Sequence, residues 1–591
     1  MNKYYSIERN AQTVLALLKA HGIKRVIASP GSTNVCMVGS MQNDPYFEMY
    51  SCIDERSAAY MAVGMARETG EPVVLSCTGA TSSRNYMPAL TEAYYSKLPL
   101  IVITSSQRSE RIGHLITQVT DRRTIPADIV KISVQVPVVK LNDDMWNCRV
   151  QVDKALTEAR REGGGPVHIN LETNYSRDFS VKELPVIPVI KRIEIDDEFP
   201  QLPEDTKIAI LIGCHRNFTK EETEKIDCFC AAYNAVVLCE MTSGYHGCYG
   251  VVYDLMAAQQ YSYTGLKSIG LMIHIGEVAG ADFSMDLKPE NVWRVHPDGE
   301  IKDPFRKLSF VFQMSESRFF TYYTSIHSEK KQNSLYNYYH NELKNLRVEL
   351  EKQDLPLSNI WMATQMYRHM PENSEIHVGI MNSFRAWNLV ELPSTVQGYC
   401  NVGGYGIDGC VSSMVGASLV NPDKLYFGVY GDLAFFYDIN ILGNHHLRHN
   451  VRILLVNNGR GNEFHNDSQT WENCFTETEI ELFGSAAGHF GCKSPLLVKN
   501  FAENLGFEYL TASSKEEFNR CVEYFLDPKP LEKPIIFEVF TIGSDESRAF
   551  HMMRNLRVDT KEYLKDMVKK TAVKIVGEDK ARLTKSIFLG D

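Results

Sequence analysis

The sequence predicts an α/β protein with three doubly wound parallel-sheet domains, of which the central one is smaller than the other two. Short apolar runs alternate along the chain with helical patterns, which is the order found in parallel sheets covered by helices on both faces. A Pro-rich stretch and a charged helical stretch divide these runs into three groups. The composition of the 591 residues, 44% hydrophobic and 23% charged, is that of a globular protein with room for about three or four domains.

The first domain is expected over residues 1–185. A helical pattern near Val14 leads into repeated strand and helix units that end with the apolar run 167–171. A Pro-rich linker then opens the central domain, expected over residues 186–345, whose first strand is predicted at 207–213. This domain closes with a charged segment that is predicted to be a solvated linker helix.

A third α/β domain is expected over residues 346–545, where the run 534–539 supplies a last buried strand. The remaining residues, 546–591, are predicted to form a C-terminal helical tail. Its apolar stripe, with Leu564 and Met567, is surrounded by lysines. A docked helix and a site for an anionic partner both stay open for this tail.

Net charge and cysteine pattern exclude several classes of protein. A net charge of −11 and a pI near 5.9 argue against nucleic acid as the main partner. No segment approaches the roughly 18 uninterrupted apolar residues of a membrane span, and no signal-peptide core is recognisable. The 14 cysteines are scattered without zinc spacing, which indicates reduced thiols. We therefore expect a cytoplasmic enzyme that acts on small molecules.

The stretch from Tyr426 to Phe464 has the pattern of a strand, a helix and a second strand. The first strand ends in Gly431-Asp432 and the second in Asn457-Asn458, so Asp432 and Asn458 are expected side by side at one sheet edge. A carboxylate and an amide oxygen suit Mg²⁺ that shares its other positions with a diphosphate. A strand edge closed by Asx turns is the alternative.

A second signal lies upstream at Asp54-Glu55-Arg56. There a carboxylate opens a helix rich in small residues, and the helix leads into a strand that ends in a loop at Gly79. Glu55 is the candidate functional carboxylate of this motif. Helix-start electrostatics, which favour Asp and Glu in a first turn, are the alternative explanation.

Together these motifs resemble those of thiamine-diphosphate enzymes of the decarboxylase and acetolactate-synthase group. The resemblance implies a pyrimidine-binding first domain and a diphosphate-binding third domain around the central one. It implies that Asp432, Asn458 and the main-chain carbonyl of Arg460 hold Mg²⁺, and that Glu55 meets the aminopyrimidine ring. The other cofactor contacts that it implies are Gly79, Ile407, Gly431, Leu433 and Ala434, with Ile407 as the apolar wedge that keeps the cofactor bent.

Within this group the sequence is most similar to the menaquinone-pathway synthases that make succinyl-enolpyruvyl-hydroxycyclohexene carboxylate. The similarity covers nearly the whole chain apart from the tail. The matching motifs include Ser29-Pro30-Gly31-Ser32, Gly406-Ile407-Asp408-Gly409, Gly431-Asp432-Leu433 and Asn457-Asn458. The substrate contacts that the resemblance suggests are Ser32, Thr33, Gln118, Ser383 and Arg385, and Gln118 is also a catalytic candidate that orients the donor.

The chain departs from those synthases at cationic positions that recognise carboxylate substrates. Six such positions are neutral or reversed in sign here, and Arg385 stands two residues before the position of the synthase arginine. The replacing residues are Thr33, Gln107, Ala281, Asp282, Trp387 and Val402. Since each lost contact to a charged group costs about 1.5 to 3 kcal/mol, these changes argue against tight binding of isochorismate with 2-oxoglutarate in the same pose.

The main hypothesis is a thiamine-diphosphate- and Mg²⁺-dependent decarboxylase or carboligase. It would act on a 2-oxo acid donor, form or break a carbon–carbon bond through an enamine, and transfer the unit to a carbonyl acceptor, with a neutral or polyhydroxylated acceptor favoured. The family resemblance implies a homodimer or homotetramer in which Glu55 and Asp432 of one site come from different chains.

Three alternatives stay open. The chain could be a true menaquinone-pathway synthase that uses relocated arginines. It could instead bind FAD in its central domain, as acetolactate synthases do. It could also be a catalytically silent assembly protein that binds the cofactor, although an intact Glu55 argues against silence.

Overall fold

The computed structural model describes residues 4–203, 205–261, 265, 267–327, 331–466, 475–488, 494–529, 531–561, 563–564 and 567. The chain divides into two compact units. The first contains residues 1–194 and 299–311, and the second contains residues 195–298 and 312–567. Most of the predicted C-terminal tail lies outside the described residues.

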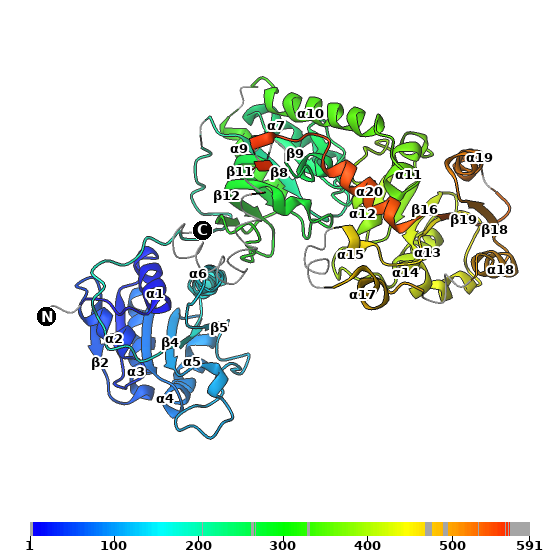
Figure 1. Ribbon diagram of the computed structural model, residues 1–591. Helices are drawn as coiled ribbons and strands as arrows, with labels where there is room; N and C mark the ends of the chain where they lie inside the picture. The colour runs from blue at the N-terminus through cyan, green and yellow to red at the C-terminus, as the bar shows by residue number, and fades with distance from the viewer. Residues whose placement is uncertain are drawn as a thin grey trace. The chain divides into compact units, whose positions relative to one another are not determined.

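The first unit holds a six-stranded parallel sheet in the order β2-β1-β3-β4-β6-β5 (Figure 1). Its strands are β1 (Arg25–Ala28), β2 (Glu48–Ser51), β3 (Val73–Thr78), β4 (Leu100–Ser106), β5 (Ser133–Val136) and β6 (Val167–Glu172). Its helices are α1 (Arg9–Ala20), α2 (Val35–Gln42), α3 (Glu55–Thr69), α4 (Thr81–Asn85), α5 (Met87–Tyr95) and α6 (Asn142–Glu158). Short strands β7 (Lys191–Ile193) and β13 (Leu308–Phe312) lie further along the chain.

Alternating side chains of the strands in the first unit pack into two separate hydrophobic cores. Val74, Ile101 and Ile103 pack with α1, α2 and α6, whereas Leu75 and Val102 pack with α3 and α5. Because successive strand residues point to opposite faces, this period of two places helices on both sides of the sheet. The predicted doubly wound fold is therefore confirmed for this unit.

The second unit contains two further parallel sheets. The first has the parallel order β10-β9-β8-β11-β12. Its strands are β8 (Ile208–Ile212), β9 (Val236–Cys239), β10 (Gly250–Val252), β11 (Ser268–Ile275) and β12 (Lys288–Val295). The helices beside it are α7 (Lys220–Tyr233), α8 (Asp254–Ala257), α9 (Glu316–Ile326) and α10 (Ser334–Glu351).

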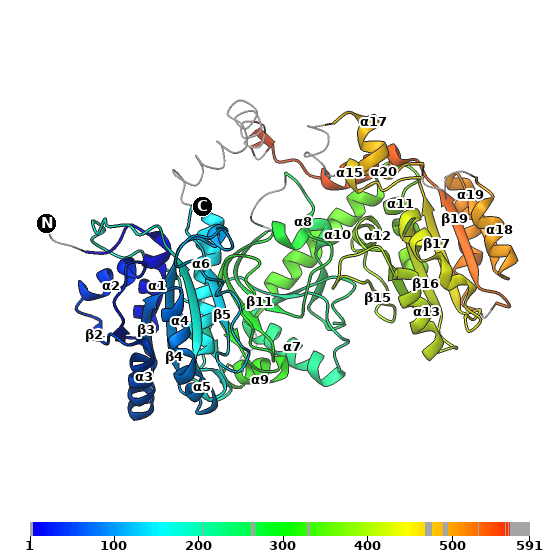
Figure 2. The ribbon, with the colours of Figure 1, turned by 90° about the horizontal axis from the view of Figure 1, so that it is seen from below.

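Helix α10 corrects the prediction of a solvated linker helix. It packs against α8, beside which it lies in Figure 2, and against β9 and β10. One face is buried along its length by Leu335, Tyr339, Leu343, Leu346 and Leu350. The spacing of three and four residues between these side chains is that of an amphipathic helix, so only the opposite face is solvated.

The second sheet of this unit has the order β15-β14-β16-β17-β19-β18, and all its pairs are parallel. Its strands are β14 (Glu375–Val378), β15 (Gln397–Tyr399), β16 (Tyr426–Gly431), β17 (Val451–Asn457), β18 (Glu508–Ala512) and β19 (Ile535–Phe540). The main helices around it are α11 (Asn359–Met366), α12 (Asn382–Trp387), α13 (Cys410–Val420), α14 (Asp432–Tyr437), α18 (Leu497–Asn504), α19 (Lys515–Phe525) and α20 (Gly543–Arg554). Shorter helices α15 (Glu463–Asn466) and α17 (Glu477–Glu479) follow β17.

Strand order in this sheet fixes where a ligand can bind. The chain passes from β14 outward to β15, returns to β16 on the other side of β14, and continues outward to β17. In open α/β sheets such a reversal leaves a crevice at the carboxyl ends of the two central strands. Here those ends are the loops that follow β14 and β16. Each of the three sheets falls within one predicted domain, and the domain limits at 185, 345 and 545 remain predictions. No helix in the described part of the chain is long and apolar enough to span a bilayer.

Candidate active site

The two predicted metal ligands lie at the carboxyl ends of neighbouring strands. Strands β16 and β17 pair in parallel, with Gly431 opposite Val456, so Asp432 and Asn458 follow at the same edge. Asp432 begins α14 and is only 2% exposed. The predicted arrangement of strand, helix and strand is confirmed, although α14 has only 6 residues.

Backbone amides hold the Asp432 carboxylate in a fixed orientation. One oxygen accepts a hydrogen bond from the Leu433 N–H at 2.7 Å, and the other accepts one from the Gly459 N–H at 2.6 Å. The amide oxygen of Asn458 accepts a hydrogen bond from the Arg460 N–H at 3.1 Å. A buried carboxylate beside an amide oxygen is a hard donor set that fits Mg²⁺, because this ion prefers oxygen ligands.

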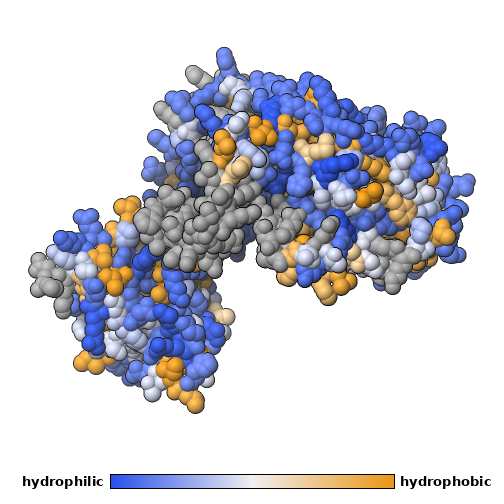
Figure 3. All heavy atoms as spheres, viewed as in Figure 1, coloured by the Kyte–Doolittle hydropathy of each residue, from blue (hydrophilic) through white to orange (hydrophobic). Residues whose placement is uncertain are grey.

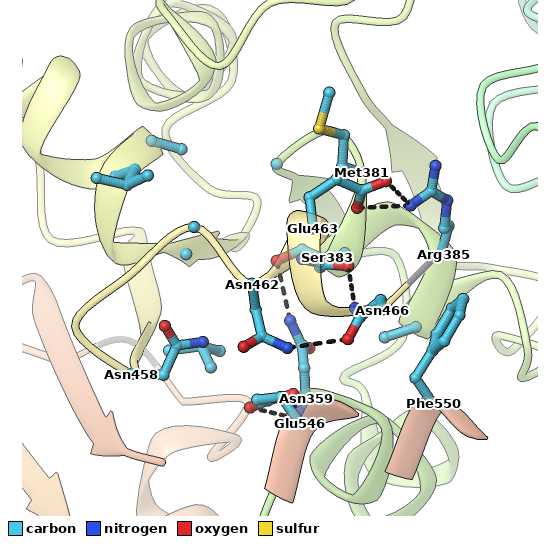
Figure 4. A pocket seen from close by; sticks show the side chains of 18 of the residues that line it. Asn359, Met381, Ser383, Arg385, Asn458, Asn462, Glu463, Asn466, Glu546 and Phe550 are labelled. Atoms are coloured by element: carbon cyan, nitrogen blue, oxygen red, sulfur yellow. Dashed lines mark hydrogen bonds and ion pairs between the residues drawn. The ribbon is translucent and has the colours of Figure 1, made fainter. Parts of the chain in front are cut away.

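A cavity of about 380 Å³ opens at this edge, and the loops after β14 and β16 line it (Figure 4). Nine of the residues that the sequence proposed for the site line this cavity. They are Ser383, Arg385, Ile407, Gly431, Asp432, Leu433, Ala434, Asn458 and Arg460. The crevice expected from the strand order thus coincides with the predicted diphosphate-binding site.

Arg385, the predicted substrate cation, is already paired with two carboxylates. Its Nη1 lies 2.6 and 2.7 Å from the two carboxylate oxygens of Glu463 (Figure 4), and its Nη2 lies 2.9 Å from Asp282. Its Nε donates to the carbonyl of Ala281 at 3.3 Å. Burial lowers the pKa of Arg385, but the charges and hydrogen bonds of Glu463 and Asp282 outweigh it and raise the pKa. The positive charge is therefore compensated inside the protein.

A belt of polar side chains that the sequence analysis missed borders the same cavity. Asn359 donates from Nδ2 to Ser383 Oγ at 3.0 Å, and its N–H lies 3.1 Å from both carboxylate oxygens of Glu546. Asn462 and Asn466 continue the belt, with 2.9 Å between their side chains. Their elements meet only in the folded protein, so no spacing in the sequence announces them.

Helix α20, which lines the cavity, crosses the predicted start of the C-terminal tail at Glu546. The residue is 8% exposed, and burial raises the pKa of its carboxyl to about 7, with further contributions from the negative charges of Asp545 and Asp432. Phe550 of the same helix lines the cavity (Figure 4), as does Met553. The first turns of the predicted tail therefore belong to the site.

In the first unit, Glu55 is the first residue of α3. Asp54 caps this helix, because its carboxylate accepts a hydrogen bond from the Arg56 N–H at 3.0 Å. The Glu55 carboxylate accepts a hydrogen bond from Asn85 Nδ2 at 3.0 Å. This contact to α4 orients the half-buried carboxylate of Glu55. Because Asp54 caps the helix, Glu55 is available as a functional acid.

The other predicted residues of the first unit follow its strands at their carboxyl ends. Ser32 follows β1 and is exposed, whereas Thr33 is buried and donates from Oγ1 to the Ser105 carbonyl at 2.7 Å. The Thr33 hydroxyl is thus used within the protein, which weakens its predicted substrate role. Gly79 directly follows β3, and Gln118 lies in the loop after β4 with a positive φ of 62°.

Comparison with known proteins supports the same assignment. The family described as "Thiamine pyrophosphate enzyme, N-terminal TPP binding domain" matches residues 9–125. The chain is 30% identical over 564 residues to the 2-succinyl-5-enolpyruvyl-6-hydroxy-3-cyclohexene-1-carboxylate synthase of Bacteroides thetaiotaomicron, covering 92% of this chain and 98% of the relative. The synthases of Bacteroides fragilis and Porphyromonas gingivalis are 29% and 25% identical, over 93% of this chain and 100% and 99% of theirs. These matches confirm the predicted resemblance and the thiamine diphosphate cofactor.

Proposed function

Because this chain belongs to the family of 2-succinyl-5-enolpyruvyl-6-hydroxy-3-cyclohexene-1-carboxylate synthases, we propose that it is a thiamine-diphosphate- and Mg²⁺-dependent carboligase. It removes carbon dioxide from a 2-oxo acid and joins the remaining unit to a second substrate. The observation that carries this proposal is the single cavity in which Asp432, Asn458 and Ile407 come together.

When it is bound, thiamine diphosphate supplies the nucleophilic carbon and the electron sink of the reaction. Asp432, Asn458 and the main-chain carbonyl of Arg460 would hold the metal ion that binds the diphosphate. Gly431 lets the backbone approach the phosphates closely, since it carries no side chain. Glu55 would exchange a proton with the aminopyrimidine ring.

The substrates of the relatives are the first candidates for this chain. The chain spans 98% of the Bacteroides thetaiotaomicron synthase, and this coverage supports an activity of the same kind. The test is direct: the purified chain with thiamine diphosphate, Mg²⁺, 2-oxoglutarate and isochorismate should release carbon dioxide and form the relatives' product, detected by mass spectrometry. Absence of that product, while carbon dioxide is released from another 2-oxo acid, would reject these substrates and leave a thiamine-diphosphate-dependent enzyme that acts on a different donor.

A different acceptor is the second candidate, and the pairing of Arg385 favours it. A guanidinium that already binds Glu463 and Asp282 has little positive charge left for a substrate carboxylate. A neutral acceptor, such as a sugar derivative, would need no such cation. A panel of 2-oxo acids, each assayed for carbon dioxide release with and without neutral carbonyl acceptors, separates this candidate from the first.

The same preparations test the two remaining alternatives. Bound FAD would give a yellow protein with flavin absorbance, and a colourless protein would exclude FAD as a resident cofactor. Release of carbon dioxide from any 2-oxo acid would exclude a catalytically silent assembly protein. We expect colourless protein with measurable release.

We propose at least a homodimer, in which Glu55 and Asp432 of one site come from different chains. Large hydrophobic side chains stand exposed on the strand and helices around Glu55, and a partner could cover them. They are Tyr50, Ile53, Tyr60, Met61 and Tyr95. Figure 3 shows hydrophobic residues scattered among hydrophilic ones on the visible face. Sedimentation should give a dimer or tetramer. Glu55→Gln and Asp432→Ala proteins unfolded and refolded together should regain part of the activity, and exchange of subunits without recovery would reject shared sites.

A further inference from the structure

A buried arginine, Arg122, stands in the long loop between β4 and β5. The loop runs from Gln107 to Ile132 and contains only one short 3₁₀ turn. Arg122 is 4% exposed, although Asp121 and Arg123 on either side of it are exposed. Its side chain is therefore turned inward directly beneath the surface, which is unusual for a charged residue in a polar loop.

The guanidinium of Arg122 is only partly satisfied. Its Nη2 donates to Asn170 Oδ1 at 2.6 Å. Its Nε and Nη1, which carry three of the five N–H donors, are buried and have no hydrogen-bond partner among the residues that the structure describes. Among the described residues, no carboxylate forms an ion pair with Arg122. A buried cation without an ion-pair partner is energetically unfavourable unless an anion binds to it.

The hydrogen-bond network beside Arg122 consists of neutral polar side chains, and Arg84 and Asp121 are the charged side chains nearby. Asn170 donates from Nδ2 to Gln135 Oε1 at 2.5 Å, and Thr104 lies 2.7 Å from His168 Nε2. Burial lowers the pKa of Arg122 to about 10, so it stays charged at neutral pH. Burial and the nearby positive charges of Arg122 and Arg84 lower the pKa of His168 to about 3, so it stays neutral. The positive charge is thus left uncompensated by this network.

The position of Arg122 links this charge to the predicted cofactor site. A Cβ at Gly79 would lie 1.8 Å from Arg122 Nη1, so the guanidinium rests on the backbone of Gly79, and only glycine permits that approach. Gly79 follows β3, which is next to β1 in the sheet at the point where the strand order reverses. Ligands of open α/β sheets bind at this point. Gln118, the predicted donor-orienting residue, lies on the same loop.

We propose that Arg122 binds the carboxylate of a 2-oxo acid substrate through N–H donors of its guanidinium that have no partner within the protein. This inference rests on the proposed function and deepens it, because it assigns the recognition of a negatively charged substrate to a residue outside the cationic positions of the relatives. A planar guanidinium suits a carboxylate, and charge-assisted hydrogen bonds of this type are stronger than neutral ones. In this proposal Arg122 is the substrate-binding cation of the first unit. Thr33 and Gln107 of the same unit are neutral.

The test compares Arg122→Met and Arg122→Gln with the control Arg123→Met. Arg123 is exposed and pairs with Asp121, so its loss removes an equal charge from the loop surface. The full-length chain, with thiamine diphosphate and Mg²⁺ present, is melted with pyruvate or 2-oxoglutarate and with their methyl esters. We expect the acids, but not the esters, to raise the Tm of wild type and of Arg123→Met, and to leave both Arg122 variants unshifted.

Two further measurements separate recognition from a structural role. Without substrate, Arg122→Met should melt no lower than wild type, because the substitution removes an uncompensated buried charge. The KM for the 2-oxo acid should rise roughly 10- to 100-fold in both Arg122 variants and change less than about twofold in Arg123→Met. Arg122→Gln keeps a polar side chain against Asn170, so it remains informative if the Met variant fails to fold.

The outcomes distinguish this proposal from the proposed function. Turnover of a 2-oxo acid with equal KM in wild type and Arg122→Gln would overturn the role of Arg122 and leave the carboligase intact. A Tm shift that depends on Arg122, without release of carbon dioxide from any 2-oxo acid, would support the carboxylate site and contradict the carboligase. The absence of any difference between acid and ester in wild type would also overturn the proposal.

Discussion

Glu463→Gln tests whether Arg385 is held away from substrate by its two carboxylate partners. The substitution keeps the size of the side chain but removes the charge that binds Arg385 Nη1 at 2.6 and 2.7 Å. Hydrogen bonds to charged groups contribute about 1.5 to 3 kcal/mol each, and glutamine keeps one acceptor. Because the Glu463 side chain is 24% exposed and Asp282 still pairs with Arg385, we expect the free energy of unfolding to fall by only about 1 to 2 kcal/mol.

The same substitution should free part of the guanidinium for a substrate carboxylate. We expect the KM for the dicarboxylate 2-oxoglutarate to fall about tenfold, which corresponds to about 1.4 kcal/mol, while the KM for pyruvate stays within about twofold. Carbon dioxide release from both acids gives the two constants, and thermal melts give the stability. Arg385→Met serves as the companion variant, since it removes the cation that Glu463→Gln releases.

One pattern of results would refute this reasoning. If Arg385→Met and Glu463→Gln both raise the KM for 2-oxoglutarate by more than about tenfold, Arg385 already contacts the substrate in the wild-type protein. Its pairing with Glu463 would then orient the cation for substrate, and the argument from Arg385 for a neutral acceptor would be wrong.

Three other predictions concern the metal, the acid and a buried carboxylate. Asp432→Ala should abolish Mg²⁺-dependent binding of thiamine diphosphate in calorimetry while the Tm without cofactor stays near that of wild type, and undiminished binding would contradict the metal assignment. Glu55→Gln keeps a hydrogen bond but cannot exchange the proton, so the cofactor should still bind while its C2 hydrogen exchanges slowly with deuterium. A wild-type exchange rate would remove Glu55 from the mechanism. Asp254 is fully buried, its oxygens have no hydrogen-bond partner in the described structure, and burial and the charge of Glu240 raise its pKa well above the usual value. Because the folded state holds this proton more tightly than the unfolded state, the contribution of Asp254 to stability is full below about pH 4 and declines as the pH rises, by about 1.4 kcal/mol per unit relative to Asp254→Asn. Melts from pH 5 to 8 should show that divergence, and parallel curves would contradict it.

The fold followed from the sequence because its strands are nearly continuous apolar runs. β4 and β17 are buried along their whole length, so their composition alone marks them as central strands of parallel sheets. The positions of Asp432 and Asn458 followed for the same reason, since each directly follows such a run. Parallel pairing then brings the ends of neighbouring strands together.

The rest of the site depends on contacts between distant segments, and local patterns do not encode them. Glu463 meets Arg385 across 78 residues, and Glu546 meets Asn359 across 187. Arg122 and Arg123 are identical neighbours in a polar loop, yet one is buried and the other exposed. Neither periodicity nor composition distinguishes them, because the backbone of the folded loop decides which side chain turns inward.

Carboligation itself is tested most directly by following the carbon skeleton of the donor. The chain is incubated with thiamine diphosphate, Mg²⁺ and 2-oxoglutarate labelled with ¹³C at C2, with isochorismate as acceptor and, in parallel, with neutral carbonyl acceptors. We predict that the label appears in a product in which C2 is bonded to a carbon of the acceptor, and that Glu55→Gln does not form it. Label found only in the free aldehyde, with every acceptor unchanged, would contradict the carboligase and leave a simple decarboxylase.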